Sequence, residues 1–357
     1  MSAAVARYAK SVEPVYTDGR DIDIAFAELS GEAASQKSSG SSDKHIQSIA
    51  QTWEQIPHVE ASDPSYYDRP MLKEPVWGWA IPTYYYAGGL SGVALSLGAA
   101  AQLGRARERE RMVFLCHLIG FAGSAVCGGL LIYDLGKPAR FLNMLRVFRP
   151  TSPMNVGAWI LTVSGGTAAG ALVLRRQRGW MRRAGTVFGY VAGVFGLALA
   201  TYTGVLVANS AVPLWQQSRA VLPALFGASA LTSAGSLFHV LAESRQDRRV
   251  TRLIGITGSL AELSAAVVME RKLAGVPRVV RPLRRGFGGF LWKSASILTA
   301  TGLAISLLRN QDRKTRLVSG LAGAAGSLVM RFAVQHAGVM SARDARASFH
   351  QQRQAHD

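Results

Sequence analysis

The side chains that could do chemistry gather at the ends of apolar stretches. Four aromatic-rich segments, EPVWGWAIPTYYYAGG, LIYDLGKPARF, ANSAVPLWQQSR and VMRFAVQHAG, add Asp134, Asn209 and Arg331 to their rings. If the apolar stretches are helices that cross a membrane in alternation, these four segments share one membrane face. Aromatic rings, Tyr hydroxyls, a carboxylate and an Arg at a bilayer edge suit a lipophilic ligand with a polar head, such as a quinone. The alternative for any single aromatic side chain is the interfacial belt of membrane proteins.

Glu262 lies near the middle of another apolar stretch, GITGSLAELSAAVVM. An isolated carboxylate inside a membrane is costly, so such acids face the interior of a helix bundle and often belong to proton pathways. Two roles stay open for Glu262: a proton relay toward or away from a quinone, or a neutral, hydrogen-bonded carboxyl group. Lys293 could be its ion partner, or could extend its ammonium group to the membrane surface.

The sequence offers few residues or motifs that indicate a metal site or a nucleotide site. His117 and His239 are expected at similar depths on the opposite face and could ligate a b-type haem, but a lone His near a helix end is usually hydrated. The only cysteines, Cys116 and Cys127, are too few for a Cys-ligated cluster or zinc site. No Walker loop, HExxH, GxSxG or Rossmann fingerprint is present. We therefore expect no haem and no metal in this chain.

Eight apolar stretches must position these residues, each near the ~20 residues that cross about 30 Å of hydrocarbon. They are predicted at 80–103, 112–133, 156–174, 186–208, 219–242, 252–271, 287–308 and 316–335. Several are rich in Gly, Ala, Ser and Thr, which let helices pack closely in lipid. The sequence therefore predicts an all-α integral membrane protein of eight transmembrane helices, arranged as two four-helix bundles.

The transmembrane domain is expected at 76–340, between a disordered polar tail at 1–75 and a polar tail at 341–357. The net charge of +18 arises from small Arg clusters between apolar stretches, which is typical of membrane loops rather than of nucleic-acid binding. The residues before the first stretch lack the apolar core of a cleavable signal peptide. A modest excess of basic residues in alternate loops predicts that both termini lie outside the cytoplasm.

Between Trp77 and Gly338 the sequence resembles a known family. The segments WGWAIPTYYYAGGLSG, LIYDLGKPARFLNML, TSPMNVGAW and YTGVLVANSAVPLW, in this order, are similar to those of the polysulfide-reductase membrane subunits (NrfD/PsrC). The resemblance implies eight helices, no bound haem, and a site for quinone or menaquinone on the face where an iron–sulfur subunit docks. It also implies a multi-pass protein of the inner (cytoplasmic) membrane, working with a molybdopterin catalytic subunit.

The resemblance also assigns residues. Tyr133 and Asp134 of the YDLG turn are the first candidates for quinone binding, joined by Tyr84 and Tyr85. Trp77 is a further candidate, since some family members place a His near the start of the first helix and this chain has none there. For Asp134 the alternative is a helix cap or a partner for Arg140.

Three further cations lie close behind the YDLG turn. Arg140, Arg146 and Arg149 could dock an acidic partner or face lipid phosphates.

The leading functional hypothesis is a quinone-reactive membrane subunit that passes electrons between the quinone pool and an iron–sulfur partner. Two alternatives remain at this stage. A secondary transporter or channel is compatible with Glu262 and the small-residue helices, although no interrupted helices in matching halves are evident. A passive anchor without quinone contact is compatible with the missing first-helix His.

Overall fold

The computed structural model describes residues 22–23, 28–29, 72–104, 109–344 and 347. In the first part, strand β1 (Ile22–Asp23) pairs antiparallel with β2 (Glu28–Leu29), with Ile22 opposite Leu29. The predicted disorder of the rest of the 1–75 tail, and most of the 341–357 tail, lies outside the described residues.

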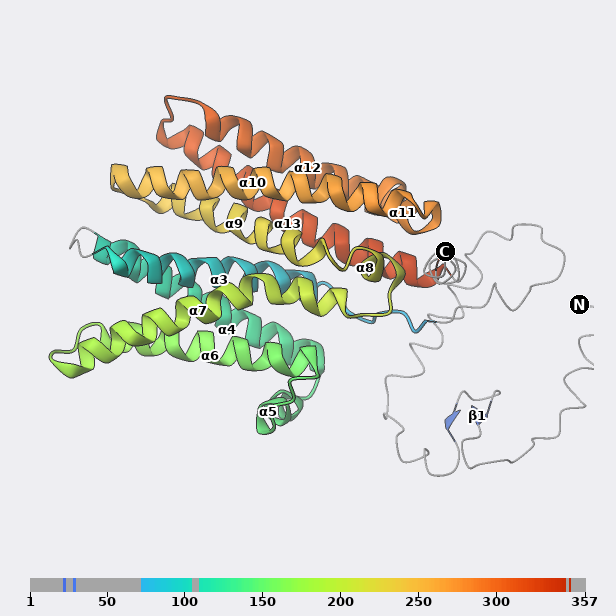
Figure 1. Ribbon diagram of the computed structural model, residues 1–357, viewed down its shortest axis with the longest axis horizontal. Coiled ribbons are helices and arrows are strands. Elements are labelled where there is room, and N and C mark those ends of the chain that lie inside the picture. The colour runs from blue at the N-terminus through green and yellow to red at the C-terminus, as the bar shows by residue number, and fades with distance from the viewer. Residues whose placement is uncertain (1–21, 24–27, 30–71, 105–108, 345–346, 348–357) are drawn as a thin grey trace, which may run out of the picture. The chain divides into compact units, whose positions relative to one another are not determined.

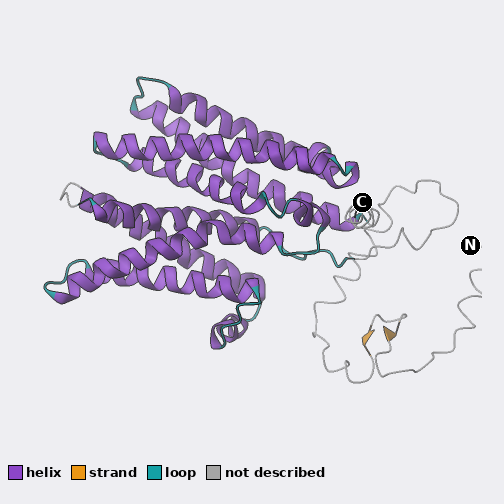
Figure 2. Cartoon of the chain, viewed as in Figure 1, coloured by secondary structure: helices purple, strands orange, loops and turns teal. Residues whose placement is uncertain are grey.

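Eight long helices follow in the remaining described ranges (Figures 1 and 2). They are α3 (Ala80–Leu103), α4 (Glu110–Leu135), α6 (Pro153–Leu174), α7 (Trp180–Ala208), α9 (Leu222–Leu241), α10 (Arg245–Ala274), α12 (Gly286–Leu307) and α13 (Arg313–Arg343). Each contains one of the eight predicted stretches almost entirely. Three of them, α7, α10 and α13, are 29, 30 and 31 residues long and extend well past the apolar residues. The additional helical turns at their ends contain charged residues, so hydropathy alone does not detect them.

Seven of these helices are long and apolar enough to cross a membrane: α4, α6, α7, α9, α10, α12 and α13. Helix α3 is not among these seven. It is long enough to cross a membrane, because its 24 residues span about 36 Å, but its composition is less apolar. It packs against α4, α7 and α9, and 13 of its residues are buried. A helix enclosed by protein can carry polar residues that a lipid-facing helix cannot. The predicted multi-pass, all-helical membrane fold is confirmed.

The helices form two bundles of four, as predicted. Helices α3, α4, α6 and α7 form the N-terminal bundle, and α9, α10, α12 and α13 form the C-terminal bundle. Helices α3 and α7 meet α9 and α13 along a seam between the bundles.

Glycines allow the closest helix contacts. A Cβ on Gly258 of α10 would overlap the backbone of α9, and one on Gly204 of α7 would lie 2.7 Å from Pro223. Such contacts explain the small-residue stretches, because dispersion between tightly packed backbones drives association in lipid.

Three short helices were not predicted from the sequence: α5 (Pro138–Arg146), α8 (Pro213–Gln217) and α11 (Pro277–Arg284). Each starts with proline, whose fixed φ suits the first turn of a helix. They connect α4 to α6, α7 to α9 and α10 to α12, so all three lie at the same end of the bundles (Figure 1). We call this end the pocket face and the opposite end the far face.

Candidate functional site

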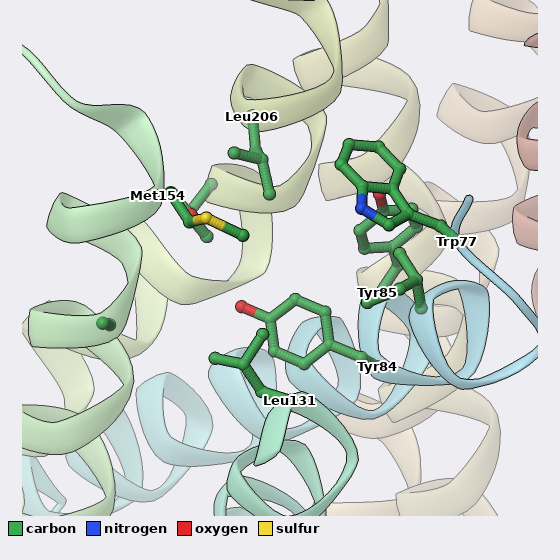
Figure 3. Close-up of a pocket in the computed structure, with 9 residues that line it drawn as sticks. Trp77, Tyr84, Tyr85, Leu131, Met154 and Leu206 are labelled. Carbon is green, nitrogen blue, oxygen red and sulfur yellow. The ribbon is translucent and has the colours of Figure 1, made fainter. Parts of the chain in front are cut away.

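A small pocket opens at the pocket face of the N-terminal bundle (Figure 3). Its enclosed volume is about 20 Å³. Its lining is aromatic and apolar and comes from the start of α3, the end of α4, α6 and α7. The lining residues are Trp77, Ile81, Tyr84, Tyr85, Leu131, Met154, Ala158, Tyr202 and Leu206. Three of the five predicted quinone residues, Trp77, Tyr84 and Tyr85, therefore come together in one cavity.

Three tyrosines form the polar part of this pocket. Tyr84 and Tyr85 follow each other on α3, and both lie close enough to Tyr202 of α7 to interact electrostatically. Figure 3 shows the Tyr84 hydroxyl pointing across the pocket toward Met154. The Tyr85 hydroxyl is buried and has no hydrogen-bond partner among the described residues. Buried hydroxyls without protein partners are rare in folded proteins, so the Tyr85 hydroxyl is free to donate to a bound molecule.

The PMNVG motif of α6 shapes one wall of the pocket. The Tyr202 ring lies directly against Gly157, where any Cβ would overlap it. Two residues earlier, the Asn155 side chain donates to the carbonyls of Met144 (2.5 Å) and Val147 (3.0 Å) and accepts from the Arg149 backbone N–H (2.7 Å). Asn155 thus ties the turn after α5 to α6, and Gly157 makes room for a pocket tyrosine.

Trp77 is held in place from the C-terminal bundle. Its ring stacks on Trp215 of α8, with centroids 5.9 Å apart. Trp215 is fully buried, donates through Nε1 to the Val334 carbonyl at 3.0 Å, and lies against Gly338 of α13. The AVPLW segment therefore positions the pocket residue that precedes α3.

Tyr133 and Asp134 lie beside the pocket rather than among its lining residues. Tyr133 is 66% exposed and its ring contacts Trp79, which is 59% exposed, with centroids 5.8 Å apart. Asp134 is half-buried and near enough to Tyr85 to interact electrostatically. No ion pair joins Asp134 to Arg140, and α5 begins after Lys137, so neither conventional role expected for Asp134 is observed in the described residues.

The predicted docking cations lie on the surface of the pocket face. Arg140 and Arg146 are exposed on α5, and Arg149 is exposed in the turn after it. Leu142 and Phe148, between them, are 65% and 58% exposed. This mixed basic and apolar surface remains unoccupied by the rest of the described chain.

Glu262 lies in the C-terminal bundle and is 3% exposed. Its Oε2 accepts from Ser327 Oγ of α13 at 3.0 Å, and the hydroxyls of Thr232 and Ser229 of α9 lie beside the carboxyl group. Its charged neighbour is Arg331 of α13.

Of the two roles left open for Lys293, the ion pair with Glu262 is not observed among the described residues. Lys293 is exposed on the surface of α12. The neighbouring Trp292, on the adjacent side of that helix, faces the small cavity beside Glu262 instead. Successive residues on a helix point about 100° apart, so only one of the two can face the carboxyl group.

Arg331 is the most deeply buried charge of the described chain, at 1% exposure. Its guanidinium carbon lies 3.8 Å from the centre of the Phe226 ring, and Nη2 donates to the Phe226 carbonyl at 2.7 Å. The remaining Nε and Nη1 have no hydrogen-bond partner among the described residues. Besides Glu262, Arg331 interacts electrostatically with Tyr85 and Tyr86 of α3, so it faces both bundles across the seam.

The two histidines lie in different bundles. His117 of α4 is buried, whereas both ring nitrogens of His239 of α9 are engaged by Arg248 O (3.2 Å) and Gln311 Oε1 (2.8 Å). Cys116 and Cys127 are buried free thiols. Within the described ranges, no group of three or more His, Cys, Asp or Glu side chains could hold a metal ion.

Two residues of this region were not predicted to have the roles that the structure indicates. Tyr202 lies in the quoted YTGVLVANS segment, and Arg331 in VMRFAVQHAG. Both are polar residues inside apolar stretches, and this pattern alone predicts that their side chains face the interior of the helix bundle. The sequence could not show that Arg331, rather than Lys293, faces Glu262.

Comparison with known proteins agrees with the family resemblance of the sequence. A family profile described as "Polysulphide reductase, NrfD" matches residues 69–341, from just before the pocket to near the end of α13. A search among curated proteins found no match.

Proposed function

The chain belongs to the polysulphide reductase NrfD family, a family of membrane subunits of respiratory oxidoreductase complexes, and from this premise we propose that its aromatic pocket binds a quinone. Electrons would then pass between the bound quinone and an iron–sulfur partner subunit docked at the pocket face. The single observation that carries the proposal is the pocket itself, where three tyrosines and a tryptophan surround an opening at the pocket face.

The chemistry of the lining suits a quinone ring. Reducing a quinone to a quinol takes two electrons and two protons, and its two carbonyl oxygens accept hydrogen bonds. The Tyr84 hydroxyl points across the pocket, and the Tyr85 hydroxyl has no partner among the described residues, so both can donate to such oxygens. Leu131, Ile81 and Leu206 supply the apolar surface that an isoprenoid ligand requires.

The enclosed space of about 20 Å³ is smaller than a quinone ring. Met154 and Leu206 border the opening in Figure 3, and Met is unbranched and adopts many rotamers. A ring can therefore enter by displacing these side chains without moving a helix. Asp134, half-buried beside Tyr85, is positioned to exchange protons between this hydroxyl and the aqueous surface.

The partner surface is proposed on the same face. Arg140, Arg146 and Arg149 present three cations around exposed apolar residues, a mixture suited to an acidic protein surface. An iron–sulfur subunit docked there would place its cluster near the pocket, and a molybdopterin subunit would complete the complex. We place the complex in the inner (cytoplasmic) membrane, where a quinone pool is available.

The test is the quinol reactivity of the whole complex, purified in mild detergent through a tag on this chain. We expect an iron–sulfur protein to co-purify and quinol to reduce an artificial electron acceptor, or the reverse reaction. Tyr84→Phe and Tyr85→Phe should each lower kcat/KM for the quinone about tenfold, the effect of losing about 1.4 kcal/mol of hydrogen bonding. Tyr190→Phe, in the far-face half of α7, is the matched control and should retain full activity.

The surface pair requires its own variant. Tyr133→Phe combined with Asp134→Asn should slow turnover while the complex assembles normally, because it removes the proposed proton exchange. A correctly assembled complex that exchanges electrons with quinone at full rate in the Tyr84, Tyr85 and Tyr133/Asp134 variants would show that quinone does not react at this pocket. A complex that contains the iron–sulfur protein but neither oxidises quinol nor reduces quinone would leave only a passive anchor. Transport of a substrate by the isolated chain in liposomes would instead favour a transporter.

A further inference from the structure

The region around α11 concentrates positive charge at the pocket face of the C-terminal bundle. Helix α11 buries Val279, Val280 and Leu283, whereas its arginines are exposed. The exposed cations of α11 and its flanking residues are Arg271, Lys272, Arg278, Arg281, Arg284 and Arg285. An amphipathic helix with a basic polar side, at the end of a transmembrane bundle, is typical of a membrane surface.

Two of these arginines have no acidic partner among the described residues. The nearby carboxylates of Glu270 and Asp344 are paired with other arginines of α11, at 2.8 and 3.7 Å. Arg281 and Arg285 make no ion pair with the described chain. The Arg285 backbone N–H donates to the Arg281 carbonyl at 2.9 Å, so the two residues lie one helical turn apart. They therefore present two positive charges together that the described chain does not neutralise.

An exposed apolar surface continues from Arg285 along the first turns of α12. Phe287 and Phe290 are both exposed, and their rings stack with centroids 6.4 Å apart. Lys293 and Ile297 follow at the next turns and are exposed as well. Because α12 packs on α10, α11 and α13, these residues form the side of the helix that lipid contacts.

Lys293 places a cation within this lipid-facing surface. It comes seven residues after Gly286, the first residue of α12, and so lies about 10 Å along the helix. Side chains of a helix tilt toward its N-terminus, and α12 starts at the pocket face. The long Lys293 side chain can therefore extend toward the level of Phe290 and Arg285. A cation on a lipid-facing surface is costly, and an anion at this level lowers the cost.

We propose that Arg281, Arg285, Phe287, Phe290 and Lys293 bind one anionic phospholipid, and we call these five residues the α12 lipid site. The lipid phosphate lies between the two guanidinium groups and the Lys293 ammonium group. The acyl chains lie on the two phenylalanine rings and continue along α12.

The arrangement of the α12 lipid site favours a phospholipid over an acidic protein. A protein docked at the pocket face could reach the arginines of α11, but Lys293 lies farther along a lipid-facing helix, beyond the two phenylalanine rings. A phospholipid carries a phosphate at the headgroup level and apolar chains below it, in the same order as the cations and rings of the site.

The α12 lipid site is independent of the proposed quinone pocket. It belongs to the C-terminal bundle, whereas the pocket and the proposed partner surface on α5 belong to the N-terminal bundle. The inference therefore stands or fails without any quinone activity.

The experiment measures binding of phosphatidylglycerol to the full-length chain in mild detergent. Native mass spectrometry counts the phospholipid molecules that the chain retains, and circular dichroism follows thermal unfolding as phosphatidylglycerol is added. We expect one retained phosphatidylglycerol and a Tm that rises with its concentration, because a ligand of the native state stabilises it. Phosphatidylcholine and inorganic phosphate at the same concentrations should raise the Tm much less.

Two variants test the cations of the site. Lys293→Leu should lower the affinity for phosphatidylglycerol about fivefold, and Arg281→Gln combined with Arg285→Gln about 25-fold, since each cation near a membrane surface contributes about one such factor. Lys293→Arg retains the charge and should retain the affinity. Arg176→Gln combined with Arg178→Gln is the matched control, because it removes two exposed charges at the far face. It should leave the affinity unchanged.

Three results would overturn the inference. The first is equal affinity for phosphatidylglycerol in the unmodified chain, Lys293→Leu and the Arg281/Arg285 variant. The second is a Tm that phosphatidylcholine or inorganic phosphate raises as much as phosphatidylglycerol does. The third is loss of a co-purifying protein from the Arg281/Arg285 variant while phosphatidylglycerol binding is unchanged, which would assign these arginines to a protein partner.

Discussion

The two bundles carry their polar chemistry in opposite ways. The N-terminal bundle has uncharged hydroxyls in a pocket at the pocket face, next to the exposed rings of Trp79 and Tyr133. The C-terminal bundle encloses two charges, Glu262 and Arg331, in its deepest part. A ligand that arrives through the bilayer needs an opening that hydroxyls can border at little cost. Charges in the same lipid-facing position would be expensive, so they are placed where the protein supplies partners.

The largest test of this contrast is the removal of one buried charge. Arg331→Met leaves the Glu262 carboxyl group without its charged neighbour and removes the hydrogen bond to the Phe226 carbonyl. Because the buried Glu262 carboxyl group is then left in a low dielectric without a neighbouring positive charge, we expect a loss of about 3–5 kcal/mol in the free energy of unfolding. Unfolding in mixed detergent micelles, followed by circular dichroism, measures it.

The double variant shows whether the two charges depend on each other. Glu262→Gln combined with Arg331→Met should recover part of the stability that Arg331→Met loses, giving a coupling energy of about 0.5–3 kcal/mol in a double-mutant cycle. Strictly additive effects would mean that the two charges are independent, and the contrast between the bundles would then rest on burial alone.

A middle-sized effect is expected at the pocket wall. In Gly157→Ala the new methyl group overlaps the Tyr202 ring and forces it into the pocket. Overpacking of this kind costs about 1–3 kcal/mol of stability and, if the pocket binds quinone, raises the KM for quinone. Gly166→Ala is the matched control on the same helix, because a Cβ at Gly166 meets no atom within 4 Å.

The control variant, Gly166→Ala, is expected to change the stability in the opposite direction. Alanine is a better helix former than glycine, so Gly166→Ala should stabilise the protein slightly, by about 0.5–1 kcal/mol. Equal stability of the two alanine variants, with unchanged quinone kinetics, would show that the Tyr202 ring moves freely and that its position against Gly157 does not shape the pocket.

The smallest effect is expected for an exposed charge of the C-terminal bundle. Asp312 caps α13 by accepting hydrogen bonds from the Thr315 hydroxyl and from its backbone N–H (2.8 Å). These bonds, first the hydroxyl and then the N–H, lower the pKa of the Asp312 carboxyl group below its ordinary value. A lowered pKa means that the stabilisation is present above the ordinary Asp pKa and is lost as the pH falls through the folded-state value.

Asp312→Ala should therefore lower the Tm slightly at neutral pH, and the difference should disappear in strong acid. Asp312→Asn retains a capping side chain without a titrating group, so its Tm should show less of this acid dependence. Thermal unfolding in detergent across the acidic range measures both. A loss as large as that of Arg331→Met would contradict the distinction between exposed and buried charge.

Much of the fold could be predicted because membrane insertion depends on local composition. A stretch of about 20 apolar residues must be a helix in lipid, since its backbone groups find no partner there except each other. The eight helices and the shared face of Trp77, Tyr84 and Tyr133 followed from length and alternation alone. The short helices α5, α8 and α11 did not, because five to nine residues carry too little periodicity to be distinguished from a loop.

The sequence predicted on which face of the membrane domain the candidate site lies, but not which side chains contact one another there. Tyr84, Tyr85 and Trp77 line the pocket, whereas Tyr133 contacts Trp79 beside it. One residue of difference along a helix turns a side chain by about 100°, and hydropathy does not resolve that angle when both neighbours are aromatic or polar.

By itself, the sequence determined an eight-helix membrane protein with aromatic and acidic residues near one face and a carboxylate in the middle of the sixth helix. Only the tertiary structure decided which charge faces Glu262. Arg331 and Glu262 are 69 positions apart and lie on different helices, and no local pattern reports how two helices rotate against each other. That rotation depends on the glycines at which α9, α10 and α13 make contact, because close packing of whole surfaces, rather than any single residue, sets it.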